Sequence, residues 1–168
     1  LQSDIEFEEG MHSREIIEEA DIVMKSPGIP EAVPIVQDLM EKGIPVISEI
    51  EFANDFYHGT VVGITGANGK TTTTMLAHHI FKQACLIAGM GGNIGMSLAL
   101  LVAEEDYDHA VLELSSFQLD GIRTFKPDIA ILLNITPDHL DRYQGEIKRY
   151  AASKFRICLN QDKDDSFI

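Results

Sequence analysis

The chain has 168 residues, of which 45% are hydrophobic, and its formal net charge at pH 7 is −14. This size and composition indicate a soluble globular protein of one domain or two small ones. The acidic balance disfavours nucleic acid and anionic membrane surfaces as partners, and no apolar run is long enough for a membrane span.

The first residues, LQSDIEFEEG, are acidic where a secretory leader would be basic, and the sequence does not open with Met. We therefore expect a piece of a longer, cytoplasmic protein. Cys85 and Cys158 have neither CxxC nor metal-site spacing and are consistent with a reducing compartment.

The first part of the chain alternates short helical and extended patterns. Pro34 falls in the first turn of a predicted helix, where a missing N–H is tolerated. The polar, Gly-containing stretch 54–59 predicts a boundary between residues 1–56 and residues 57–168. The predicted elements are helices at 14–20, 31–43 and 49–57, strands at 21–25 and 44–48, and a loop at 26–30.

A second series of elements follows the boundary. Its strands are apolar and separated by helices, which predicts parallel sheets covered by helices and thus an α/β fold. The predicted strands are 60–65, 85–89, 109–115 and 128–136, the predicted helices are 70–84, 96–105 and 145–160, and residues 91–95 form a loop.

The segment GITGANGKTTTT, residues 63–74, joins a predicted strand to a predicted helix. Gly66 and Gly69 permit positive φ angles, so successive N–H groups can point inward as a nest for phosphate oxygens. The helix N-terminus behind them adds partial positive charge. Lys70 is then placed to reach the β- and γ-phosphates of a nucleotide, and Thr71 to offer its hydroxyl to Mg²⁺.

This segment departs from the general pattern G-x-x-x-x-G-K-[ST] at one position, because Ile64 stands where the pattern has Gly. The alternative is a Gly-rich strand-to-helix turn that binds no ligand. We favour the phosphate site because the strand, the glycines, Gly-Lys-Thr and the helix occur in the required order. The expected nucleotide contacts are Gly66, Ala67, Asn68, Gly69, Lys70, Thr71 and Thr72.

The variant TGANGKTTT resembles the phosphate loop of the Mur ligase family, T-G-x-N-G-K-[ST]-[ST]. Further segments match the family in the family's order over most of the chain. They are SPGIP (26–30), GGNIG (91–95), LELSSFQL (112–119), NITPDHLDRY (134–143) and YAASKFRI (150–157). LELSSFQL is similar to the members that add D-glutamate, whereas the other Mur ligases and the folylpolyglutamate synthases differ there.

The resemblance implies an ATP-dependent amide ligase of peptidoglycan precursor synthesis, with UDP-N-acetylmuramoyl-L-alanine, D-glutamate and ATP as substrates. ATP would phosphorylate the carboxylate of the UDP-sugar-alanine, and the amine of D-glutamate would attack the acyl phosphate. The resemblance also implies two Mg²⁺ ions in the longer protein, and it gives no indication of a protein partner.

In the family's arrangement, residues 1–56 would close a Rossmann-like UDP-binding domain and residues 57–168 would begin a P-loop ATPase domain. We expect such a fragment to be inactive alone. Another Mur ligase or a folylpolyglutamate synthase is the alternative within the family, and a P-loop module that binds nucleotide without ligase chemistry is the alternative from another class.

Glu113 ends an apolar strand, at the sheet edge from which the phosphate segment also emerges. A Mg²⁺ ligand is expected at this place, and the resemblance assigns the role to Glu113 together with Thr71. The alternative is an ordinary acidic residue in solvent. The resemblance also places Ser115 and Gln118 beside the substrate, whereas Ser116 fits a cap of the next turn.

The segment NITPDHLDRY follows another apolar strand and emerges at the same edge. The resemblance makes His139 a ligand of a second Mg²⁺, with Asp138 beside it. Residue chemistry alone would make His139 a base or a hydrogen-bond donor, because Mg²⁺ prefers oxygen ligands.

Two loops are implied to contact the UDP-linked substrate. The resemblance assigns Asn93 in GGNIG to the sugar-peptide, although Asn93 also fits a helix cap. Ser26 and Gly28 in SPGIP are placed near the uridine diphosphate, and their alternative is a simple Pro-Gly turn.

Lys154 lies in YAASKFRI, on a predicted helix with one apolar face. The sequence alone favours a solvated lysine, but Lys154 matches the family's modified lysine and is then expected to carry a carbamate in the longer protein. Loss of solvation lowers the pKa of a lysine and exposes an amine that can add CO₂. The carbamate would hold the second Mg²⁺ with His139, so that Lys70, His139 and Lys154 become the expected catalytic residues.

Overall fold

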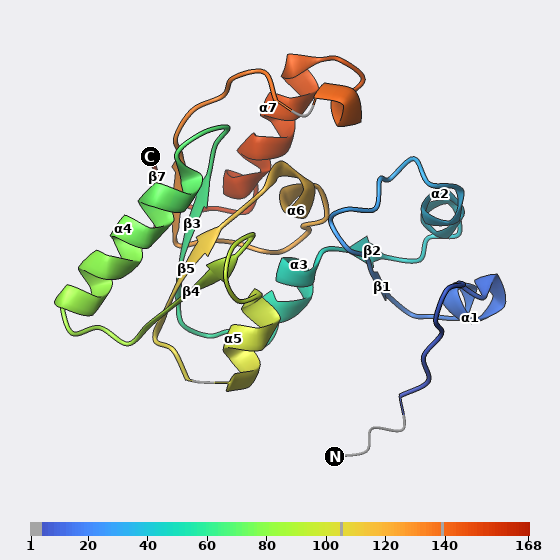
Figure 1. Cartoon of the computed structure of the whole chain (residues 1–168), viewed down its shortest axis with the longest axis horizontal. Helices are drawn as coiled ribbons and strands as arrows, with labels where there is room; N and C mark the ends of the chain where they lie inside the picture. The colour runs from blue at the N-terminus through green and yellow to red at the C-terminus, as the bar shows by residue number, and fades with distance from the viewer. Residues whose placement is uncertain (1–4, 105, 139) are drawn as a thin grey trace.

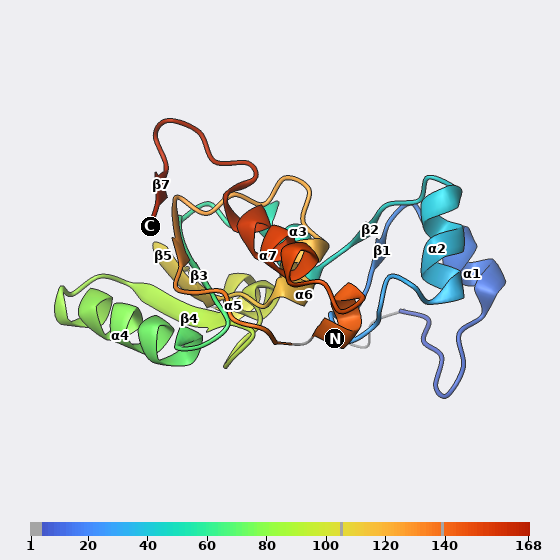
Figure 2. The same ribbon diagram turned by 90° about the horizontal axis from the view of Figure 1, so that it is seen from above.

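The structure is a computed structural model that describes residues 5–104, 106–138 and 140–168. It has two lobes joined by a short connection, as Figures 1 and 2 show from two directions. The N-terminal lobe, residues 5–48, contains α1 (Arg14–Glu18), β1 (Val23–Met24), α2 (Pro34–Glu41) and β2 (Val46–Ile47).

The C-terminal lobe, residues 49–168, is larger and holds a five-stranded sheet. Its helices are α3 (Glu49–Asn54), α4 (Lys70–Gln83), α5 (Leu98–Glu104), α6 (Ser116–Asp120) and α7 (Ile147–Phe155), with 3₁₀ turns η1 (Leu140–Tyr143) and η2 (Arg156–Cys158). Its strands are β3 (Thr60–Thr65), β4 (Ala88–Gly92), β5 (His109–Glu113), β6 (Ile129–Leu132) and β7 (Ser166–Phe167).

The strand order of the large sheet is β4-β5-β3-β6-β7, and every pair in it is parallel. Strand β3 is therefore central, with β5 on one side and β6 on the other. The carboxyl ends of parallel strands share one edge, so the segments after β3, β5 and β6 meet there. The predicted α/β fold is confirmed.

The two faces of the sheet are buried by different elements. Along β3, Val61 contributes to one core cluster and Val62 and Ile64 to the other, as the alternation of side chains on a strand requires. Helix α4 covers the smaller cluster, and α3, α5 and α6 lie on the other face, with α7 packed against α6 (Figure 1).

Helix α3 belongs by packing to the C-terminal lobe, although the predicted boundary lies after it. Ile50 and Ala53 are buried in the larger core cluster, and α3 lies against α5. The Glu51 carboxylate accepts hydrogen bonds from the N–H groups of Arg123 and Phe125 and from both donors of Thr124. The division at residues 56 and 57 remains a prediction, but the packing places the join before α3.

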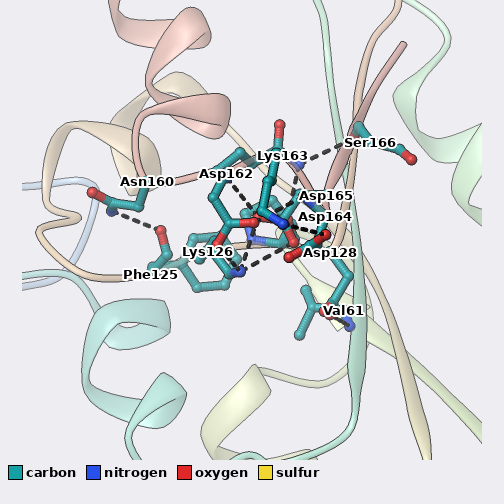
Figure 3. Close-up of polar contacts among 12 residues, drawn as sticks. Val61, Phe125, Lys126, Asp128, Asn160, Asp162, Lys163, Asp164, Asp165 and Ser166 are labelled. Atoms are coloured by element: carbon teal, nitrogen blue, oxygen red, sulfur yellow. Dashed lines mark hydrogen bonds and ion pairs between the residues drawn. The ribbon is translucent and has the colours of Figure 1, made fainter.

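The segment 121–128, which leads into β6, is fixed from several directions. Asn160 donates to the carbonyl oxygens of Arg123 and Phe125, while Lys126 forms ion pairs with Asp162 and Asp165 (Figure 3). The C-terminal strand β7 is thereby held at the edge of the sheet. Among the described residues, no helix combines the length and apolar character needed to cross a bilayer.

Some element boundaries differ from the prediction. The strand predicted at 85–89 runs from Ala88 to Gly92, so two glycines assigned to the GGNIG loop lie in a strand. A Cβ on Gly91 would come within 2.2 Å of the Met96 carbonyl oxygen, and close packing thus explains a glycine there. Helix α6, turn η1 and strand β7 were not predicted.

Candidate nucleotide site

The phosphate loop, residues 66–69, joins the central strand β3 to α4. Gly66 has a φ of 151° and Gly69 a φ of 84°, both in the region that favours glycine. A Cβ on Gly66 would lie 3.0 Å from Leu133 Cβ, because the loop passes close to the end of β6. Gly69 caps α4 in the left-handed conformation, so the first N–H groups of α4 face the carboxyl edge of the sheet.

Two lysines hold the carbonyl groups of the loop. Lys70 Nζ donates to the carbonyl oxygens of Gly66 and Ala67, each at 2.9 Å. Lys154 Nζ reaches the Gly66 oxygen at 2.8 Å from α7. Both positive charges thus lie beside the N-terminus of α4, in a chain whose net charge is −14.

The N–H groups of the loop are not all turned inward. Those of Ala67 and Asn68 donate to the main-chain and side-chain oxygens of Asn134, each at 2.9 Å. The sequence predicted a nest of successive N–H groups for phosphate, and the structure differs because Asn134, in the segment after β6, supplies competing acceptors.

Glu113 lies at the end of β5, directly beside the start of α4. The residue is buried, with 2% of its surface exposed. One carboxylate oxygen accepts from the Thr71 hydroxyl at 2.7 Å, and the other accepts from the side-chain amide of Asn93 at 2.8 Å. The structure thus brings together the two residues that were predicted to bind one metal ion, and it joins a residue predicted for substrate to the same cluster.

The Thr71–Glu113 pair has the chemistry that a magnesium ion requires. A hydroxyl and a carboxylate are hard oxygen donors, and Mg²⁺ is commonly held by one or two protein oxygens plus phosphate and water. Among the described residues, no group of three or more His, Cys, Asp and Glu side chains converges as a metal site.

Lys154 is buried, with 2% of its surface exposed, and the prediction of a solvated lysine from sequence alone is wrong. Its ammonium lies 4.7 Å from the centre of the Tyr150 ring. Burial, and then the nearby charge of Lys70, lower the pKa of Lys154 to about 8. A larger fraction of neutral amine is therefore present near neutral pH than for an ordinary lysine.

A model of the Mur ligase middle domain matches residues 64–168. The chain belongs to the Mur ligase family. It is also 59% identical over 165 residues to the UDP-N-acetylmuramoylalanine–D-glutamate ligase of Christiangramia forsetii, and 57% identical over 164 residues to the ligase of the same name from Bacteroides fragilis. These alignments cover 98% of this chain but 37% of each relative.

Solved Mur ligases share the fold of this chain at low identity. UDP-N-acetylmuramate:L-alanyl-gamma-D-glutamyl-meso-diaminopimelate ligase from Neisseria meningitides matches with a TM-score of 0.59 and 18% identity, over 92% of this chain and 53% of that one. MurF ligase from Thermotoga maritima in complex with ADP matches with a TM-score of 0.52 and 23% identity, over 73% of this chain and 36% of that one.

In this Mur ligase chain, the LELSSFQL segment forms a helix start. Ser115 caps α6, since its hydroxyl accepts from the N–H of Gln118 at 3.2 Å and the Gln118 side chain accepts from the N–H of Ser115 at 3.0 Å. This capping box gives Ser115 and Gln118 a structural task. The cap is Ser115 and not Ser116, which is buried.

The SPGIP loop lies across from the C-terminal lobe and is held by Arg142 of η1. The Arg142 guanidinium donates to the carbonyl oxygens of Pro27 and Gly28, both at 3.1 Å, and lies 4.4 Å from the centre of the Phe117 ring. Ser26 and Gly28 are exposed, and the N–H of Gly28 donates to the Ser26 hydroxyl at 3.4 Å. A cavity of about 740 Å³ opens beside this contact, between α2 and α7.

Two residues of this edge need separate mention. His139 lies outside the described residues, so its expected role at a metal ion remains a prediction. Asn134 was not singled out from the sequence, although it lies in NITPDHLDRY. Its position two residues after the end of β6, at the edge that carries the phosphate loop, is the signal that could have found it.

Proposed function

We propose that this chain is part of an ATP-dependent, cytoplasmic amide ligase that adds D-glutamate to UDP-N-acetylmuramoyl-L-alanine. The observation that carries the proposal is the 59% identity, over 98% of the chain, to a ligase of that name. The chain spans 37% of that relative's length, so ligase activity is proposed for the longer protein and not for these residues alone.

In this proposal the phosphate loop and α4 bind the phosphates of ATP. The free N–H groups at the helix start and the ammonium of Lys70 offset the negative charge of the transferring phosphoryl group. Lys70 keeps a third N–H for phosphate while it holds the Gly66 and Ala67 carbonyls. The γ-phosphoryl passes to the substrate carboxylate, and the amine of D-glutamate then displaces phosphate from the acyl phosphate.

Thr71 and Glu113 would hold a Mg²⁺ ion, with Asn93 keeping the Glu113 carboxylate in place. Bound Mg²⁺ would neutralise charge on the phosphate oxygens. Asn93 and the SPGIP residues Ser26 and Gly28 are proposed to contact the UDP-linked substrate. For Ser115 and Gln118 the proposed contact has to coexist with their capping box.

Lys154 is proposed to carry a carbamate that holds a second Mg²⁺ with His139. The buried position and the pKa of about 8 support the proposal, because a neutral amine is the form that adds CO₂. In the unmodified side chain, the ammonium instead donates to the loop carbonyl of Gly66.

The experiment replaces the matching segment of the Christiangramia forsetii ligase with this chain and measures ADP release. We expect release that depends on both UDP-N-acetylmuramoyl-L-alanine and D-glutamate. Lys70→Ala should lower the rate by about a hundredfold or more, the loss of one preorganised donor to a phosphoryl group. The matched control is Lys82→Ala, an exposed lysine in the last turn of the same helix.

Two outcomes would count against the proposal. Turnover with another amino acid in place of D-glutamate would indicate a different Mur ligase. Nucleotide binding without any amide product, and without dependence on Lys154, would favour a P-loop binding module.

A further inference from the structure

We propose that Asn134 is a positioning residue for the phosphate loop: it takes up the N–H groups of Ala67 and Asn68, so that only the N–H groups from Gly69 onward receive phosphate. The inference rests on the proposed nucleotide site. It adds a residue from the segment after β6 to a loop that is otherwise built by β3 and α4.

Asn134 contacts the loop through three hydrogen bonds. Its carbonyl oxygen accepts from the N–H of Ala67, and its side-chain oxygen accepts from the N–H of Asn68. Its side-chain NH₂ donates to the carbonyl oxygen of Asn68 at 2.9 Å. The loop and the segment after β6 share one more hydrogen bond, in which the side-chain NH₂ of Asn68 donates to the hydroxyl of Thr136 at 3.1 Å.

The hydrogen bonds from Asn134 and from the two lysines give partners to the main-chain N–H and C=O groups in the middle of the loop. The carbonyls of Gly66 and Ala67 accept from lysine ammonium groups. Both groups of Asn68 and the N–H of Ala67 are bonded to Asn134. Among the described residues, no partner accepts from the N–H groups of Lys70, Thr71 or Thr72, which are the unpaired donors of a helix start.

The side chain at this position has to accept and donate at once. An asparagine amide offers an oxygen and an NH₂ on adjacent sites, which match the N–H and C=O of Asn68. An aspartate would keep the acceptor, but its second oxygen would face the Asn68 carbonyl and add negative charge next to the phosphates. An alanine would lose both side-chain bonds and keep the main-chain bond to Ala67.

The test uses this chain with Asn134→Ala, Asn134→Asp and the control Asn160→Ala. Asn160 also makes two hydrogen bonds to loop carbonyls, but in the 121–128 segment, away from the phosphate loop. The first measurement is hydrogen exchange of the Ala67 and Asn68 amides by NMR. The second is the affinity for Mg-ADP, measured by calorimetry.

We expect Asn134→Ala to speed exchange at Asn68, because it removes the side-chain acceptor of that N–H. We expect Asn134→Asp to weaken Mg-ADP binding at least as much as Asn134→Ala. Because Asn68 and Asn134 are exposed, the expected loss is about fivefold to tenfold in affinity. Asn160→Ala should bind Mg-ADP like the unmutated chain. Asn134→Ala with affinity within about twofold of the unmutated chain would overturn the proposal.

A failure of the proposed nucleotide site would give a different result in these measurements. If the unmutated chain binds no Mg-ADP, the nucleotide site is wrong for this chain, and amide exchange alone decides the role of Asn134. In that case, unchanged exchange at Asn68 in Asn134→Ala would overturn the inference as well, whereas Ala67 keeps its main-chain bond and serves as the reference.

Discussion

The two lobes differ in how they bury their apolar side chains. In the N-terminal lobe the sheet has two strands of two residues each, and the buried hydrophobic side chains are Val36, Leu39 and Ile47. Phe7, Met11 and Met40 are more than half exposed. In the C-terminal lobe a five-stranded sheet is covered on both faces, and two core clusters form.

Both lobes alternate helices and strands, so this alternation alone does not produce a hydrophobic core. Burial grows with the number of strands that share one sheet, because each added strand covers its neighbours and offers both faces to helices. We therefore expect most of the unfolding free energy to reside in the C-terminal lobe, and the nucleotide site to depend on that lobe for its geometry.

The sharpest test of this comparison is the pair Leu119→Ala and Leu39→Ala, which remove the same atoms from two buried sites. Each should cost about 3 kcal/mol locally. We expect Leu119→Ala to lower the global unfolding free energy in urea, and Leu39→Ala to raise hydrogen exchange in the N-terminal lobe only. Equal losses of global stability would mean that the lobes unfold as one cooperative unit.

A smaller effect is expected from Glu51→Gln, which tests whether α3 is part of the C-terminal lobe. Burial alone would raise the pKa of Glu51, but its hydrogen bonds together lower the pKa below its usual value of 4.5. The charged form is thus stabilised, and Glu51→Gln should cost about 2 kcal/mol at pH 7.

The sign of the pH dependence follows from the lowered pKa. The contribution of Glu51 is present above pH 4.5 and is lost as the pH falls through the folded-state pKa. The difference between Glu51→Gln and the unmutated chain should therefore shrink in acid. Glu41→Gln, at an exposed position of α2, is the control, and an equal loss in that variant would remove the special role of Glu51.

The smallest effect concerns the contact between the lobes. Arg142→Ala removes two hydrogen bonds to the SPGIP loop, worth about 1 kcal/mol in a half-exposed site. We expect a broader distribution of distances between fluorescent labels on the two lobes, with little change in global stability. Arg142→Lys keeps the charge but not the two-pronged geometry, so it should behave like Arg142→Ala. An unchanged distance distribution in both variants would show that Arg142 does not fix the lobes.

Much of the fold was predictable because it is local. The strand at 60–65 is found with its predicted bounds, and α4 begins at the predicted Lys70, since apolar runs and glycines mark these positions. Strand β4 was misplaced because its glycines are selected by tertiary packing, which leaves no local signal. Strand β7 exists only through its pairing with β6, so its two residues carry no pattern of their own.

The residues of the candidate site were predictable where a sequence motif includes them, and not where their role depends on a tertiary contact. The Gly-Lys-Thr motif named Thr71, the sheet edge pointed to Glu113, and the family resemblance paired the two, which the structure puts in hydrogen-bonding distance. The burial of Lys154 depends on how α7 packs, and residue chemistry alone favoured the opposite. Asn134 and Asn68 are far apart in the sequence, and a single sequence does not show that their side-chain and main-chain groups meet in the fold.

The central position of β3 has a consequence for biosynthesis. Thr60 pairs with His109, and Val62 pairs with Ile129, so both neighbours of β3 are translated long after it. Parallel pairing between distant segments is slow to form. Until residues 109–132 have emerged from the ribosome, the apolar strand Val61–Ile64 of the nascent chain therefore lacks its sheet partners and stays accessible to a chaperone.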